Sequence, residues 1–207
     1  LGLKISGQIV NLGAGNLFLT TLFAALAIWV LGLAVPVTAS YIIAAVMVIP
    51  ALTQVGVPAV AAHMFVFYNA VLADVSPPTA LSHFAAASIT GGQPYPTMMM
   101  AWKYCLPAFL VPFMFTLSPD GTGILMLGEW GTILQTFLTA CISVVGLAIA
   151  FGGWILSDAN LLERVVAAVA GICLLWADPI FDLIGLVLLV VAVLLHWLRV
   201  RRQWSLV

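Results

Sequence analysis

The chain has 207 residues, of which 64% are hydrophobic and 6% are charged, and its formal net charge is −1. Soluble domains are about 45–50% apolar and about 25% charged, so this composition excludes an ordinary soluble domain and predicts an integral membrane protein. The 6 Lys and Arg residues are scattered, which excludes the basic stripe of a nucleic-acid-binding protein.

Helices are the predicted secondary structure. No Asp, Glu, Lys or Arg occurs between Lys4 and Asp74, a stretch long enough for at least two membrane-embedded segments. Residues 23–35 lack the alternation of a strand, so we predict an all-α polytopic membrane protein. The chain opens with Leu-Gly-Leu-Lys, without an initiator Met or a signal-like segment, and we expect it to be part of a longer polypeptide.

The first interrupted element is expected at residues 17–55. Two apolar limbs, at 17–33 and 41–55, flank a tip rich in Gly, Pro, Thr and Ser, and Asn16 is the predicted N-cap of the first limb. Each limb is shorter than the roughly 20 residues of a spanning helix. We therefore predict a re-entrant hairpin, which enters and leaves the membrane on one face; a tight loop between two short spans is the alternative.

The tip of this hairpin combines a proline with two hydroxyl side chains. Pro36 has no N–H group, so it would leave the Gly32 carbonyl without its helical partner. Thr38 or Ser40 is expected to cap the returning limb through its hydroxyl group. The tip is thus predicted to present backbone and hydroxyl oxygens inside the membrane.

The second interrupted element has a polar centre at residues 73–82 (ADVSPPTALS). Because Pro77 and Pro78 lack N–H groups, the carbonyl groups four residues earlier would lose their partners in a continuous helix. Placing an Asp at the bilayer centre costs about 2.5–3.5 kcal/mol of free energy. We therefore predict a transmembrane helix broken into two halves, at 59–73 and 79–89.

Two domains are expected. Residues 1–119 would hold the hairpin, the broken helix at about 59–89, a loop at 90–96 and a span at 101–117. Residues 120–207 would form a C-terminal extension with about three transmembrane helices. The arginines that follow the last span predict a cytoplasmic C-terminus.

The two interrupted elements also predict a binding chemistry. Carbonyl and hydroxyl oxygens favour an alkali or alkaline-earth cation over Zn or Cu. Helices that begin near residues 38–40 and 79–80 would direct their positive ends at a carboxylate, and no Arg or Lys occurs in residues 5–102 to bind one instead. Asp74 is either an ion ligand or a structural carboxylate. Paired interruptions of this kind are how secondary transporters form a site at the membrane midplane.

Signatures of an enzyme are missing. The sequence has no HExxH or GxSxG motif, and Asp74 has no second intramembrane carboxylate with which to pair. Cys105, Cys141 and Cys173 lie in apolar runs without ligand spacing and are expected to be packing residues. We predict a non-enzyme with no catalytic residues, no organic cofactor and no transition-metal site.

Five segments carry a resemblance to a known family: residues 32–45 (GLAVPVTASYIIAA), 50–52 (PAL), 62–68 (AHMFVFY), 73–81 (ADVSPPTAL) and 112–115 (PFMF). Together they resemble the DctM-like large membrane subunit of tripartite ATP-independent periplasmic (TRAP) transporters, especially the fused permeases that work with TAXI-type binding proteins. The resemblance covers about residues 1–119. It implies a Na⁺-driven importer that accepts organic anions, such as carboxylates, from a soluble periplasmic binding protein.

The resemblance also implies where the ligands bind. The implied Na⁺-binding residues are Gly32, Pro36, Thr38, Ala73, Asp74 and Ser76. The implied substrate-binding residues are Val37, Thr38, Ala39, Ser40, Pro77, Pro78 and Thr79. The family usually has Thr at two positions where this chain differs: Val37 at the tip and Ser76 at the break. Ser76 keeps the hydroxyl group of the family residue, whereas Val37 does not.

By the same resemblance, this chain would supply the second of two inverted repeats, and therefore half of a site. Its implied partners are the lipid bilayer, the periplasmic binding protein and the rest of the permease, including the first repeat and the small membrane subunit. The implied location is the inner membrane of a bacterium or archaeon, with Na⁺ as the coupling ion. The alternatives from other classes are a structural or assembly subunit and an ion channel.

Overall fold

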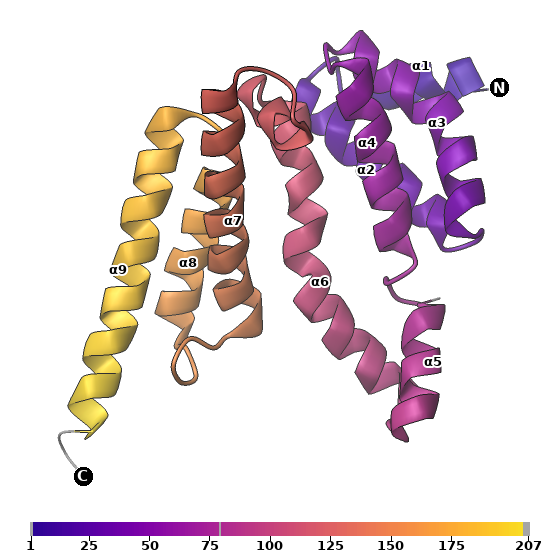
Figure 1. Cartoon of the computed structure of the whole chain (residues 1–207). Coiled ribbons are helices and arrows are strands. Elements are labelled where there is room, and N and C mark those ends of the chain that lie inside the picture. The colour runs from indigo at the N-terminus through magenta and orange to yellow at the C-terminus, as the bar shows by residue number, and fades with distance from the viewer. Residues whose placement is uncertain (1, 79, 205–207) are drawn as a thin grey trace. The chain divides into compact units, whose positions relative to one another are not determined.

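The regular elements of the chain are helices (Figure 1). The computed structural model describes residues 2–78 and 80–204. In chain order the elements are α1 (Gly2–Leu12), α2 (Leu17–Gly32), α3 (Val37–Gln54), α4 (Ala59–Ala73), α5 (Leu81–Thr90), α6 (Pro94–Leu117), the 3₁₀ helix η1 (Asp120–Leu125), α7 (Trp130–Gly152), α8 (Leu161–Leu174) and α9 (Pro179–Trp204).

Four of the described helices are long and apolar enough to cross a membrane, namely α3, α6, α7 and α9. The apolar helices α2 and α4 have 16 and 15 residues, which is short of the roughly 20 that a full span needs. The prediction of an all-α polytopic membrane protein is therefore confirmed. Helix α8, with 14 residues, is not among the candidate spans of the described chain.

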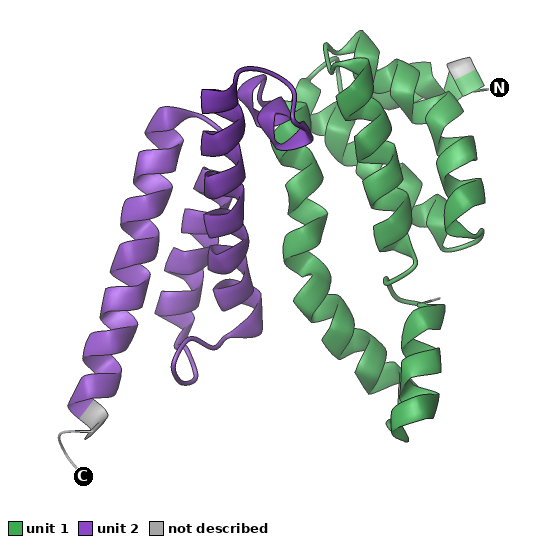
Figure 2. Ribbon diagram, viewed as in Figure 1, with its two compact units in different colours: residues 1–117 green, residues 118–207 purple. Residues whose placement is uncertain are grey.

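The chain divides into two compact units, residues 1–117 and residues 118–207 (Figure 2). The first unit contains α1 to α6, and the second contains η1 and α7 to α9. The sequence predicts a domain boundary at 119/120.

In the first unit, α2, α3 and α4 pack against one another, and α1 packs against α3. Ile28 of α2, Leu52 of α3 and Phe65 of α4 are completely buried. The ring of Phe65 meets Phe113 of α6 edge-on, with 5.8 Å between the ring centroids. The predicted N-cap of α2 is confirmed, since the Asn16 side chain accepts a hydrogen bond from the Leu19 N–H at 3.1 Å.

The connection between α5 and α6 is shorter than the loop expected at 90–96. Helix α5 continues to Thr90 and is closed by Gly91, whose φ of +71° suits a residue without a Cβ atom. Helix α6 then begins at Pro94, because a proline in the first helical turn loses no hydrogen bond. The turn residues Gly-Gly-Gln-Pro therefore end one helix and begin the next within a few positions.

In the second unit, α8 packs against both α7 and α9. Small residues allow the close approach of α7 and α8: a Cβ atom on Gly146 would lie 3.2 Å from the Ala167 carbonyl oxygen. At the same contact the Ser143 hydroxyl donates to the Gly171 carbonyl at 2.7 Å. Close packing of this kind between small residues is typical of membrane helices.

The second unit also contains a buried charged cluster, which we define as Glu163, His196 and Arg199. Glu163 is 1% exposed, and its carboxylate accepts hydrogen bonds from Arg199 Nε at 2.8 Å and from the Asn160 N–H at 3.0 Å. His196 Nδ1 lies 2.9 Å from the same carboxylate, and His196 is completely buried. Asn160 and Glu163 form a capping box at the start of α8, so the cluster joins that helix end to α9.

Candidate functional site

The candidate site is formed by the two places where apolar helices of the first unit are interrupted. The first interruption lies between the end of α2 at Gly32 and the start of α3 at Val37. Pro36 has no N–H group, and no described residue donates a backbone N–H to the Gly32 carbonyl. This carbonyl oxygen therefore keeps both lone pairs for a ligand.

The expected cap by Thr38 or Ser40 is wrong. The residue before α3 is Pro36, and α3 has no side-chain cap. Ser40 is buried, and its hydroxyl donates to the Val35 carbonyl at 3.0 Å, whereas Thr38 is exposed. The reason is positional: α3 begins at Val37, so both hydroxyl residues lie inside its first turns instead of just before it.

The second interruption lies between the end of α4 at Ala73 and the start of α5 at Leu81. The Ala73 carbonyl accepts the N–H of Ser76 at 3.1 Å, so a turn restores its hydrogen bond. The Ser76 side chain is completely buried, and its hydroxyl donates to the Leu72 carbonyl at 2.8 Å. No described residue donates a backbone N–H to the Asp74 carbonyl. Among the described residues, neither the Ser76 hydroxyl oxygen nor the Asp74 carbonyl accepts a hydrogen bond.

These two interruptions meet. A Cβ atom built on Gly32 would overlap the methyl group of Ala73, and the Ser40 hydroxyl oxygen would lie 3.8 Å from it. Ala73 is completely buried, so the contact has no room for a larger residue. A glycine at position 32 is therefore what allows the end of α2 to touch the end of α4.

The sequence-predicted site residues differ in exposure. Those that are buried or half-buried are Gly32, Val37, Ala39, Ser40, Ala73, Ser76 and Pro77. Those that are exposed are Pro36, Thr38, Asp74 and Pro78. Thr79, predicted to bind substrate, lies outside the described residues. The structure thus brings Gly32, Ser40 and Ala73 together and leaves the Thr38 and Asp74 side chains open to the surroundings.

Two polar contacts near the site were not assigned a role by the sequence. The Tyr41 hydroxyl lies 2.9 Å from His63 Nδ1, which links the first turn of α3 to α4. Asn69 of α4 is 4% exposed, and its side-chain amide donates to the Phe65 carbonyl at 2.9 Å. An Asn within an apolar helix is a signal for such a contact, because a polar side chain in the membrane needs a partner.

Residues 1–120 match the protein family described as "Tripartite ATP-independent periplasmic transporter, DctM component". The match covers more than half of the chain. The chain belongs to this DctM family. No curated protein and no solved structure matches the chain.

Because the chain belongs to the DctM family, it is a multi-pass membrane component of a TRAP transporter. The family has no enzymatic activity. The family assigns it to the membrane and to association with a binding protein and other subunits. The matched residues contain the whole first unit, and with it both interruptions. Among the described residues, no group of three or more His, Cys, Asp or Glu side chains is arranged to hold a metal ion.

Proposed function

We propose that this chain is part of a sodium-driven permease that imports organic anions, and that the contact between its two interruptions forms part of the ion and substrate site. The observation that carries the proposal is the contact of Gly32 with Ala73. It places two helix ends with unused carbonyl acceptors against each other in a DctM family chain. Paired helix interruptions are the usual location of the site in secondary transporters.

The proposed sodium ligands are oxygens at these two helix ends. The Gly32 and Asp74 carbonyls have no backbone donor among the described residues, and the Ser76 hydroxyl keeps its lone pairs while donating to Leu72. The exposed Thr38 hydroxyl completes the set on the tip side. Neutral oxygens are hard ligands that suit an alkali cation. Pro36 and Ala73 contribute by shaping the backbone, since neither side chain has a polar atom.

The proposed anion site uses the start of α3. The backbone N–H groups of Val37, Thr38 and Ala39 belong to the first turn of that helix, which has no side-chain cap and therefore leaves donors for a carboxylate. Ser40 and the segment 77–79 would close the site from the neighbouring end. Because no Arg or Lys lies between residues 5 and 102, bound sodium would supply the compensating charge.

The remaining parts of the proposal concern architecture. Helices α2 and α3 form a re-entrant hairpin, since α2 is short for a span, and α4 with α5 forms one broken transmembrane helix. The chain is the second repeat of a fused TAXI-type permease with its C-terminus in the cytoplasm. The first repeat and the small membrane subunit supply the other half of the site, and a periplasmic binding protein delivers the anion.

The test is anion uptake by the full-length parent permease, reconstituted in vesicles together with its binding protein. Ser76→Ala and Thr38→Ala are compared with Ser88→Ala, which removes an exposed hydroxyl bonded within α5. We expect the first two variants to need a higher sodium concentration for half-maximal uptake and the control to behave as wild type. Unchanged sodium dependence in both site variants would contradict the ligand assignment.

A further inference from the structure

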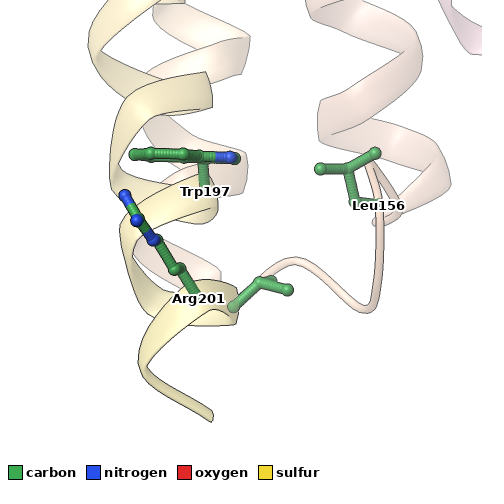
Figure 3. Close-up of a pocket in the computed structure, with 4 residues that line it drawn as sticks. Leu156, Trp197 and Arg201 are labelled. Atoms are coloured by element: carbon green, nitrogen blue, oxygen red, sulfur yellow. The ribbon is translucent and has the colours of Figure 1, made fainter. Parts of the chain in front are cut away.

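The second unit carries a groove outside the DctM match, near the C-terminal end of α9 (Figure 3). The groove has a volume of about 470 Å³ and is lined by Leu156 from the α7–α8 connection and by Trp197, Val200 and Arg201 of α9. Leu156 is 62% exposed and Trp197 is 43% exposed, so both are accessible to a molecule from the membrane. Three of the four lining side chains are hydrophobic, and the fourth is a cation.

Arg201 is held at the edge of this groove. Its guanidinium lies 5.1 Å from the centroid of the Trp197 ring, one helical turn earlier, and Figure 3 shows it directed toward that ring. A cation over an aromatic face is restrained in position, and among the described residues Arg201 makes no hydrogen bond or ion pair, so its N–H groups can donate to an anion. Glu163, the buried carboxylate at this end of the second unit, is already bound by Arg199 and His196.

Charge is segregated along the second unit. All the basic residues of 118–207 lie at the end with the groove, namely Arg164, Arg199, Arg201 and Arg202. The same end has two carboxylates, Asp158 and Glu163. The other carboxylates of the unit lie at the opposite end of its helices: Asp120, Glu129, Asp178 and Asp182. The groove therefore faces a net positive surface, which attracts an anionic ligand.

The depth of the groove in the membrane follows from α9. At its C-terminal end the apolar residues of this helix give way to Arg199, Arg201 and Arg202. Because basic residues that flank an apolar span lie at the boundary between hydrocarbon and headgroups, we place Arg201 at that level. Trp197 is one turn inside that boundary, at the level where tryptophan rings are enriched. Leu156 and Val200 thus face the acyl region while Arg201 reaches the phosphate level.

We propose that this groove binds an anionic glycerophospholipid, with its phosphate on Arg201 and an acyl chain against Leu156, Val200 and Trp197. A phospholipid matches both the cation and the hydrophobic wall of the groove, since it joins a phosphate to a hydrocarbon chain at this depth. Basic pockets beside membrane helices recognise anionic lipids in this way. The binding is independent of sodium and of the transported anion.

The test is a titration of the purified full-length chain with phosphatidylglycerol or phosphatidylcholine, read by native mass spectrometry. Arg201→Gln is expected to weaken phosphatidylglycerol binding about five-fold, the loss typical of one basic contact to an anionic lipid surface, and Arg201→Lys to restore most of it. Leu156→Asn is expected to weaken binding of both lipids. The matched control, Lys4→Gln, removes one exposed charge from the first unit and should bind as wild type.

Three results would overturn the proposal. One is equal binding of phosphatidylglycerol to wild type and Arg201→Gln. Another is an equal loss in Lys4→Gln, which would indicate an effect of net charge alone. The third is displacement of the lipid by millimolar glycerol phosphate, which would show that the groove binds a free phosphate and that its hydrophobic wall contributes nothing. Because Arg201 is exposed in the last turns of α9, these variants are expected to fold.

Discussion

The two units place their polar groups in opposite ways. In the second unit, Glu163 is paired with Arg199, with His196 and with the capping Asn160, so this buried carboxylate is compensated. In the first unit, the helix ends at Gly32 and Asp74 leave carbonyl acceptors without described backbone donors. Paired polar groups stabilise a fold, whereas unpaired ones at helix ends are available to a ligand. This difference is why we propose the ion site in the first unit and a structural role for the Glu163 cluster in the second.

The largest effect is expected from Glu163→Gln. The change replaces the charged acceptor shared by His196 and the partly exposed Arg199 with a neutral amide. Breaking a fully buried ion pair costs about 3–5 kcal/mol, which is the upper bound for this pair because Arg199 is 32% exposed. We expect the thermal unfolding temperature of the chain in detergent to fall sharply. The control Glu129→Gln changes an exposed carboxylate that makes no side-chain cap at the start of α7, and it should leave that temperature unchanged. Equal stability of the two variants would show that the cluster is not structural.

A smaller effect on stability, together with a loss of function, is expected from Gly32→Ala. The added methyl group overlaps Ala73 and would force the two helix ends apart, a packing error that costs about 1–3 kcal/mol. Sodium-dependent uptake by the full-length permease should fall, and the pair Gly32→Ala with Ala73→Gly should recover part of it, because the second change removes the overlapping methyl group.

Gly7→Ala is the matched control for that pair. A Cβ atom on Gly7 of α1 has nothing within 4 Å, so uptake should not change. If Gly32→Ala transports as well as Gly7→Ala, the contact between the two interruptions has no role in uptake.

The charged cluster also predicts a dependence on pH. Burial raises the pKa of Glu163, but hydrogen bonds from Arg199, from His196 and from the Asn160 N–H outweigh it, so the pKa lies below its ordinary value. A carboxyl group with a lowered pKa stabilises the fold above the unfolded-state pKa of about 4.3, and this stability is lost as pH falls through the folded-state pKa. Unfolding temperatures measured from pH 7 to pH 3 should therefore decrease more in wild type than in Glu163→Gln. Parallel decreases would contradict this.

The smallest effect on stability is expected from Asn16→Ala. Its side chain caps α2 through the Leu19 N–H, and loss of an N-cap costs about 1 kcal/mol. The unfolding temperature should fall slightly, while sodium dependence of uptake should stay as in wild type, because the cap lies at the opposite end of α2 from Gly32. A changed sodium dependence would mean that the start of α2 affects the proposed ion site, contrary to our proposal.

The sequence predicted local features better than distant ones. The bounds of α4 agree with the predicted 59–73, and α2 ends one residue before the predicted 33, because Gly and Pro interrupt helices through their own backbone. Helix α1 was not predicted, since its glycines lower helix propensity and its packing against α3 is a tertiary effect. The cap at α3 was wrong because the helix begins at Val37, four residues before the limb predicted to start at 41, so Thr38 and Ser40 lie inside it.

Contacts between distant residues could not be predicted from composition or spacing. Gly32 and Ala73 are far apart in the chain, and only the packing of α2 against α4 brings them together. Glu163 and His196 lie on different helices, and neither composition nor spacing predicts that both are buried. The candidate residues at the two interruptions were identified by type and by family resemblance, but their contact is a property of the fold.

The most direct test of the account is the thermal stability of the full-length permease in sodium and in potassium. A ligand that binds the folded state raises the unfolding temperature as its concentration increases. We predict that sodium, but not potassium, stabilises wild type and Ser88→Ala, and that this stabilisation is lost in Gly32→Ala and reduced in Ser76→Ala. Equal stabilisation by both cations, or full sodium stabilisation of Gly32→Ala, would contradict a cation site between the ends of α2 and α4.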